Sequence, residues 1–288
     1  MKKKDDKEMT FWDHLDELRG VIIHSFVAFA VCMILAFYFK KILFDHIILA
    51  PKEPDFITYR VICKIGKMLS MPSFCPDVST FHLININLAG QFMSHITISA
   101  VAGLIIASPY IIWKFWRFVK PGLTEKERKS TRGAAMVITL LFLTGILFSY
   151  FVVVPLMVNF LGGYQVSEMV SNQIALTSYT GIVTSMTLIM GLIFEFPVVV
   201  LFLTKIGILS PKKLRKFRKH TIVIILIVAG IITPSPDVVS QLIVAFPLYA
   251  LYEISLVISS RIYAQQILEA EKEEEEEQEE EATRQPAG

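Results

Sequence analysis

The sequence predicts an all-α polytopic membrane protein with six transmembrane helices. Of its 288 residues, 53% are hydrophobic and only 19% are charged, and the mean hydropathy is +0.55. Water-soluble proteins average about 25% charged residues. The apolar residues lie in long runs that are apolar on all sides, whereas the strands of a membrane barrel alternate apolar and polar residues in segments of about ten. This composition argues against a soluble enzyme, a disordered scaffold and a small disulfide-framed secreted domain.

Six apolar runs are the predicted spans. An α-helix needs about 20 apolar residues to cross a hydrocarbon core of about 30 Å. The runs cover residues 21–39, 92–113, 134–161, 182–203, 221–233 and 238–258. A cleaved signal peptide is the alternative for the first run, but its apolar core is usually 7–15 residues long and a small-residue cleavage site follows it. Here the run is longer and is followed by Tyr38–Lys41.

A short amphipathic helix is expected before the first span, at about residues 10–19. Phe11, Leu15 and Leu18 recur at helical spacing, and Trp12 is suited to anchor such a helix in the membrane interface.

The fifth and sixth spans are expected to be short. At about 1.5 Å per residue, the apolar run 221–233 reaches only about 20 Å, so the membrane must thin or the helix must lie against protein. The segment Thr233–Asp237 contains two prolines, which lack an amide donor and restrain the residue before them, and it is expected to turn the chain. The alternative is one long kinked helix through Ile258, which would place the C-terminus outside.

The distribution of Lys and Arg predicts that both termini are cytoplasmic. Five such residues lie in 1–19, seven in 114–132 and seven in 205–219, whereas 162–180 and 234–237 contain none. The long segment 45–91 carries four, but long loops cross the membrane largely regardless of charge.

The segment 45–91 is expected to form an ordered cap of short helices on the outer face, including an amphipathic piece over Tyr59–Leu69. It contains Cys63 and Cys75. Because the outer face of a bacterial inner membrane is oxidising, a disulfide between them is plausible, and two buried thiols are the alternative.

The chain is therefore expected to comprise a membrane domain over residues 1–268 and a disordered cytoplasmic tail over 269–288. Ten Glu residues lie between Glu269 and Glu281, and such like-charged blocks repel themselves and stay solvated.

Several polar residues lie in unfavourable surroundings and are candidates for function. Glu195 interrupts an apolar run just before Pro197; it could face a cavity or stabilise a kink within the bundle. Thr233 and Gln241 form a small polar patch beside the proline-rich turn, suited either to helix packing or to docking a partner.

Two acidic groups stand out on the basic cytoplasmic side. One is Asp13, Asp16 and Glu17 ahead of the first span; the other is Glu125 with Glu127. Thr124 and Glu127 have the spacing of a capping box, but a cap does not exclude a second role for Glu127. The motifs of zinc peptidases, serine hydrolases and P-loop enzymes do not occur, so an enzyme is not expected.

Taken together, these stretches resemble the TatC family, the multispanning subunit of the twin-arginine protein translocase. The resemblance extends over about residues 11–263 and rests on the order and spacing of several motifs: 14–19 (HLDELR), 115–123 (FWRFVKPGL), 125–128 (EKER), 150–156 (YFVVVPL), 194–197 (FEFP), 233–241 (TPSPDVVSQ) and 247–249 (PLY).

The resemblance implies a cupped, concave bundle that recognises twin-arginine signal peptides of folded proteins at the cytoplasmic face. Glu127 would be the main carboxylate for the two guanidinium groups and Glu17 the second, with Arg19 and Phe118 in the same site. Glu195 would line the concave face, and Pro51 matches a sensitive position in the first outer loop.

The resemblance also implies partners and an energy source. Thr233 and Gln241 would help to dock the single-span proteins TatA or TatB, and further copies of the chain would assemble in the bacterial inner membrane, in contact with lipid. The proton-motive force would drive export without a cofactor or metal, and no nucleic-acid partner is expected.

Two other functions remain as alternatives. A secondary transporter would use Glu195 as a proton or ion site, although no internal repeat between the two halves supports this. A scaffold that organises other membrane proteins would depend on the acidic tail.

Overall fold

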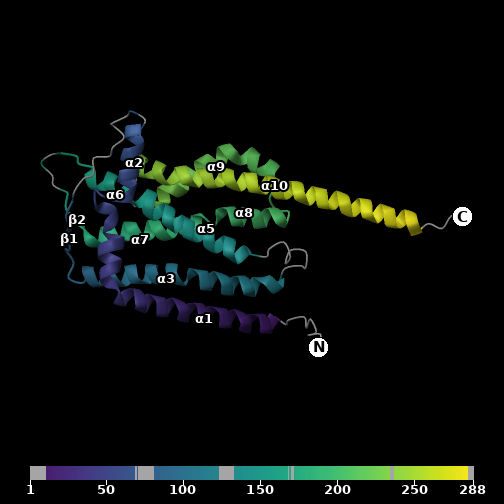
Figure 1. Ribbon diagram of the computed structural model, residues 1–288, viewed down its shortest axis with the longest axis horizontal. Coiled ribbons are helices and arrows are strands. Elements are labelled where there is room, and N and C mark those ends of the chain that lie inside the picture. The colour runs from purple at the N-terminus through teal and green to yellow at the C-terminus, as the bar shows by residue number, and fades with distance from the viewer. Residues whose placement is uncertain are drawn as a thin grey trace. The chain divides into compact units, whose positions relative to one another are not determined.

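The computed structural model is almost entirely helical (Figure 1). It describes residues 11–68, 70, 81–122, 133–167, 169, 172–233 and 237–284. The chain divides into two compact units, Met1–Gly191 and Leu192–Gly288, which are described in turn. Five helices within the described residues are long and apolar enough to cross a membrane.

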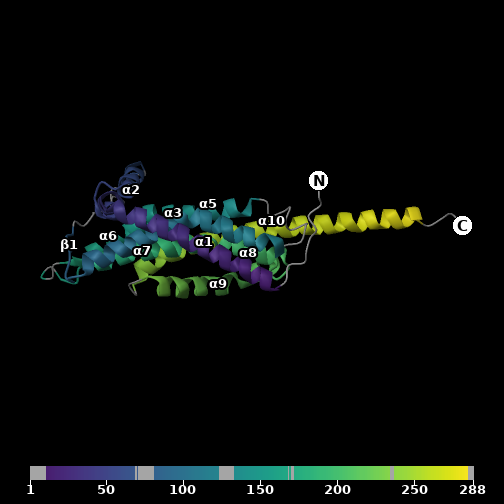
Figure 2. The same ribbon diagram turned by 90° about the horizontal axis from the view of Figure 1, so that it is seen from below.

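Helices α1 (Phe11–Tyr38) and α3 (Gly90–Val119) pack side by side in the first unit (Figures 1 and 2). Ser99, Gly103 and Ala107 recur every fourth residue on α3 and are all buried. A Cβ atom on Gly103 would lie 2.6 Å from the backbone nitrogen of Met33 on α1. Small residues thus permit the close backbone approach that is typical of helix pairs in membranes.

The expected amphipathic helix before the first span is not a separate element. The helix α1 begins at Phe11 and runs without a break into the apolar segment. Trp12 is 75% exposed, as an interfacial anchor would be.

The segment after α1 forms the expected series of short helices. A π-helical segment, η1 (Ile42–Ile48), is followed by the 3₁₀ turn η2 (Ala50–Lys52) and the helix α2 (Ile57–Met68). The expected amphipathic piece over Tyr59–Leu69 corresponds to α2.

The third predicted span consists of three helical pieces. Helix α5 (Ala134–Phe148) passes through a π-helical stretch, η5 (Ser149–Val153), into α6 (Val154–Gly163). Pro155 lies in the first turn of α6, where the amide hydrogen that proline lacks would not be used within that helix. After α6, the two-residue strand β2 (Ile174–Ala175) pairs in parallel with β1 (Leu83–Ile84), and Leu83 lies opposite Ile174.

The fourth predicted span is interrupted. Helix α7 (Leu176–Ile193) ends at a turn, and α8 (Phe196–Lys205) starts with Pro197 in its first turn. The interruption falls at Glu195, which directly precedes α8.

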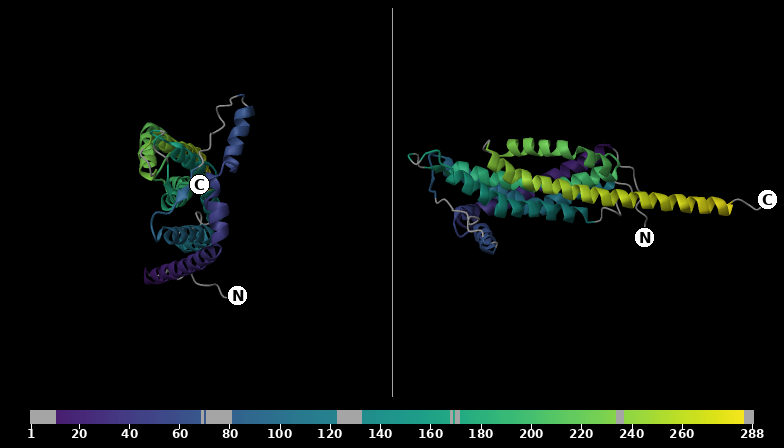
Figure 3. Two further views of the ribbon diagram at one scale, coloured as in Figure 1. Left: turned by 90° about the vertical axis from the view of Figure 1, so that its left-hand side faces the viewer. Right: turned by 90° about the horizontal axis from the view of Figure 1, so that it is seen from above.

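The second unit is built on α10 (Val238–Arg284), which packs against α8 and α9 (Pro211–Ile232) (Figure 3). Ser210 caps α9 by accepting a hydrogen bond from the Lys213 amide at 3.4 Å. Only the second half of α9 is apolar, which agrees with a short fifth span.

Helix α10 is longer than the predicted sixth span, because helix-forming residues continue without a breaker past Ile258. The segment 269–284, expected to be disordered, continues the same helix. Glu, Ala, Lys and Gln all have high helix propensity, and this outweighs the repulsion between neighbouring carboxylates in the structure. Glu271 and Glu275 are exposed.

Candidate functional site

The beginning of α1 and the end of α3 meet through two aromatic rings. The imidazole of His14 stacks on the ring of Phe118, with centroids 4.3 Å apart and planes inclined by 15°. The two residues are 104 positions apart, so no local sequence pattern predicts the contact. It brings the segment that precedes the first span beside the segment that closes the second.

Helical spacing places Glu17 beside His14 on α1. Glu17 follows His14 by three positions, and residues three apart are neighbours on a helix surface. Glu17 is exposed, and Phe118 is half-buried. Arg19 is also exposed but lies only two positions after Glu17, so the two side chains do not share a face.

The described part of this end of α3 is strongly cationic and aromatic. The Lys114 ammonium lies 5.5 Å from the ring centroid of Tyr110 and 5.8 Å from that of Trp113. The Arg117 guanidinium lies 5.9 Å from the Trp113 ring. Such cation–π contacts hold the charges in place at an exposed surface. After α3, the described chain forms the 3₁₀ turn η4 (Lys120–Gly122) and stops there. Glu127 therefore lies outside the described residues.

In the second unit, Gln241 links α10 to α9. Its side-chain Nε2 donates a hydrogen bond to the carbonyl of Leu226 at 2.7 Å. Gly230 leaves room for it, since a Cβ at that position would lie 3.2 Å from Nε2. Asp237 caps α10 by accepting a hydrogen bond from the Ser240 amide at 2.7 Å.

Thr233 and Ser240 bury their hydroxyl groups beside this link. Thr233 is 7% exposed and Ser240 fully buried. Neither hydroxyl oxygen has a hydrogen-bond partner within the described residues. A buried hydroxyl without a partner is unfavourable by about 1–3 kcal/mol.

Two acidic residues, Glu195 and Glu253, lie within the predicted spans of the second unit. Glu195 is half-buried and precedes α8, where its carbonyl accepts hydrogen bonds from the amides of Val198 and Val199. Glu253 forms an ion pair with Arg218 at 2.6 Å and accepts a hydrogen bond from the Tyr249 hydroxyl at 3.0 Å. Its partner Arg218 lies on α9, so the pair links α9 to α10.

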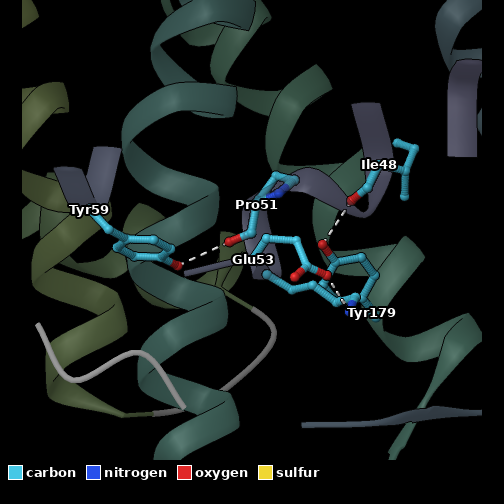
Figure 4. Close-up of polar contacts among 6 residues, drawn as sticks. Ile48, Pro51, Glu53, Tyr59 and Tyr179 are labelled. Atoms are coloured by element: carbon cyan, nitrogen blue, oxygen red, sulfur yellow. Dashed lines mark hydrogen bonds and ion pairs between the residues drawn. The ribbon is translucent and has the colours of Figure 1, made fainter. Parts of the chain in front are cut away.

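Pro51 lies in a network of tyrosine hydrogen bonds (Figure 4). The Tyr59 hydroxyl lies 3.0 Å from the Pro51 carbonyl and 2.7 Å from that of Pro155. The Tyr179 hydroxyl donates to the carbonyl of Ile48 at 2.7 Å. Tyr59 and Tyr179 are almost completely buried, and burial raises the pKa of the Tyr59 hydroxyl above its usual value. These contacts tie η1 and η2 to the membrane helices α6 and α7.

Cys63, on α2, is disulfide-bonded. Cys75 lies outside the described residues, so the pairing of the two stays a prediction. Cys32, within α1, is a free thiol.

Comparison with known proteins establishes the family. The family model "Sec-independent protein translocase protein (TatC)" matches residues 13–247. The TatC protein of Blattabacterium sp. subsp. Periplaneta americana is 39% identical over 89% of this chain and 97% of its own length. That of Carboxydothermus hydrogenoformans is 36% identical, over 88% and 94% respectively. This chain belongs to the TatC family.

Solved structures confirm the TatC fold. The crystal structure of the twin-arginine translocase receptor TatC in DDM is 33% identical and superposes with a TM-score of 0.67, covering 86% of this chain and 99% of that one. A second crystal structure of this receptor gives a TM-score of 0.62. This TatC chain is therefore a helical membrane protein and a component of a protein translocase, which is not an enzyme.

The comparisons favour the translocase over the two alternatives drawn from the sequence. The match to TatC proteins spans most of the chain, including the segment with Glu195 that a transporter would use as its ion site. The match does not depend on the acidic tail, since the family model ends at residue 247.

Proposed function

We propose that this TatC chain recognises twin-arginine signal peptides at the cytoplasmic face of the bacterial inner membrane. With single-span partners of the TatA and TatB type, it would export folded proteins at the expense of the proton-motive force. The observation that carries the proposal is the His14–Phe118 contact, which gathers the start of α1 and the end of α3 at one place. The three segments rich in Lys and Arg support a cytoplasmic location for this end.

The chemistry of the site suits an arginine pair. Guanidinium groups form planar, bidentate hydrogen bonds with carboxylates, whereas a lysine ammonium offers only a point charge. Glu17 is exposed and lies beside His14 on α1, so it is available for one guanidinium. Glu127 would receive the other. Because the surrounding loops are basic, a cationic ligand gains binding energy only if it reaches these two carboxylates.

Binding of a fluorescent twin-arginine signal peptide to the purified full-length protein tests this proposal. Replacing both peptide arginines by lysine, or introducing Glu17→Gln or Glu127→Gln, should weaken binding at least tenfold, or about 1.4 kcal/mol. Asp16→Asn is the matched control, since it removes the same charge from an exposed neighbouring position on α1. It should change binding less than twofold. Equal binding of the two peptides would contradict the proposal.

The polar patch of the second unit is proposed to dock a TatA or TatB helix. Thr233 directly follows α9, and Ser240 and Gln241 lie in the first turn of α10, where the Gln241 amide bonds to α9. In a membrane, a polar residue on a partner helix could supply a hydrogen bond to such groups, worth roughly 0.6–2 kcal/mol.

Thr233→Val separates this role from a structural one. The variant removes a hydroxyl without a partner in the described part of the chain, so thermal stability should be unchanged or slightly higher. Co-purification of a TatB-type partner should nevertheless decrease. Thr221→Val, which removes a hydroxyl that bonds to the Phe217 carbonyl on the same helix, serves as control and should leave co-purification intact. Unchanged co-purification with Thr233→Val would contradict the docking proposal.

A further inference from the structure

A cavity of about 480 Å³ opens in the first unit, at the end of α1 and α3 that is remote from the His14–Phe118 contact. Lys40 and Lys41, which follow α1, contribute two ammonium groups to its wall, and Asp45 on η1 contributes one carboxylate. All three residues are exposed. The charged groups of the wall therefore sum to one positive charge.

The rest of the wall is mainly apolar. Phe44 and Leu49 line it from the segment that follows α1, Phe92 from the first turn of α3, and Leu176 from the beginning of α7. Phe92 is 59% exposed. The cavity thus combines a cationic edge with an apolar surface formed by several elements.

His95 holds these elements together. Its ring stacks on Phe37 of α1 with centroids 3.8 Å apart and meets Phe44 of η1 edge-on at 5.8 Å. Its Nε2 lies 3.1 Å from the Phe37 carbonyl. Because a carbonyl can only accept, Nε2 carries the hydrogen of this bond. These contacts fix the passage from α1 to η1 against α3, and Lys40 and Lys41 lie within that passage.

We propose that this cavity binds the headgroup phosphate of an anionic phospholipid, with the adjoining acyl chain against Phe92 and Leu176. The two lysines stand where the apolar spans α1 and α3 terminate, which is the depth of the headgroups. Lysine is a strong point-charge partner for phosphate. The single excess positive charge matches a headgroup of one negative charge such as phosphatidylglycerol. A zwitterionic headgroup also carries a cationic group, which the two lysines would repel and only the Asp45 carboxylate would attract. The proposal is independent of signal-peptide recognition.

Native mass spectrometry of the full-length protein in detergent, titrated with phosphatidylglycerol or phosphatidylcholine, tests the site. Phosphatidylglycerol should bind more tightly. The double variant Lys40→Gln/Lys41→Gln should weaken its binding about tenfold, since each lysine near a membrane surface contributes measurably to the attraction of anionic lipid. Lys64→Gln/Lys67→Gln is the matched control, because it removes the same charge from exposed positions on α2 outside the cavity wall.

A second variant tests the cavity itself. Leu176→Trp retains both lysines and fills the apolar part, so it should weaken phosphatidylglycerol binding while the charge is unchanged. Inorganic phosphate at millimolar concentration should not displace the lipid.

Three results would overturn the proposal: equal binding of the two lipids, an equal loss in the α2 control, or full displacement by inorganic phosphate. If the double lysine variant fails to fold, the Leu176→Trp result decides, and unchanged lipid binding there contradicts the proposal. Signal-peptide binding, measured on the same preparations, should remain at the wild-type level in every variant.

Discussion

Tyr59 shows how one side chain attaches the outer segment to the membrane helices. Its buried hydroxyl lies within hydrogen-bond distance of the carbonyls of Pro51 and Pro155, which are more than 100 positions apart. The expectation that Pro51 is a sensitive position therefore acquires a physical reason: its carbonyl is part of a buried contact between η2, α2 and α6.

Tyr59→Phe should destabilise the protein. The variant leaves two carbonyl groups without this donor, and an unsatisfied buried group costs about 1–3 kcal/mol. We expect a lower apparent Tm of the purified protein. Tyr38→Phe, at a position that is 80% exposed, is the control and should have little effect. Equal Tm values for wild type and Tyr59→Phe would contradict this role.

The raised pKa of Tyr59 also predicts a pH dependence. Because the folded state favours the protonated phenol, its contribution to stability is retained below the ordinary tyrosine pKa of about 10 and lost as the pH rises above it. The wild-type Tm should therefore fall more steeply between about pH 9 and 11 than that of Tyr59→Phe. Parallel curves for the two proteins would contradict it.

At the scale of elements, the packing of α1 on α3 depends on Gly103. A Cβ atom at this position would approach the Met33 backbone to 2.6 Å, which requires the helices to move apart.

Gly103→Val should therefore lower the apparent Tm, in line with the usual overpacking cost of about 1–3 kcal/mol or more. It should also weaken signal-peptide binding, since the same two helices carry Glu17 and Phe118. Gly20→Ala on α1 is the control: nothing lies within 4 Å of its Cβ position, and alanine favours the helix. A wild-type Tm for Gly103→Val would show that the helix pair tolerates separation.

The acidic end of α10 is a separable element. It lies outside residues 13–247, which match the family model. Deleting residues 269–288 should therefore leave signal-peptide affinity within twofold of the wild type. A larger loss would give this helical extension a role in recognition.

At the scale of the whole molecule, the sequence predicted most of the helices but not how they meet. Apolar runs locate spans well, because burial in lipid requires them to be apolar on all sides. The bounds of α1, α3 and α10 extend beyond the predicted spans because helix-forming polar residues flank the apolar runs. The β1–β2 pair and the His14–Phe118 contact join residues about 90 or more positions apart, and nothing in the local sequence encodes them.

The number of spans sets the location of the C-terminus. If α9 and α10 cross the membrane separately, we expect both termini to lie in the cytoplasm. A green fluorescent protein fused after Gly288 should therefore fluoresce, and alkaline phosphatase fused there should be inactive. The opposite pattern would mean that residues 221–258 cross the membrane only once.

We propose that Glu17, near the His14–Phe118 contact, binds an arginine of the signal peptide. A double-mutant cycle between Glu17→Gln and replacement of each peptide arginine by lysine measures this contact directly. We predict a coupling free energy of about 1.5–3 kcal/mol for one of the two arginines, as expected for a charge-assisted hydrogen bond. Coupling near zero for both arginines would contradict the claim.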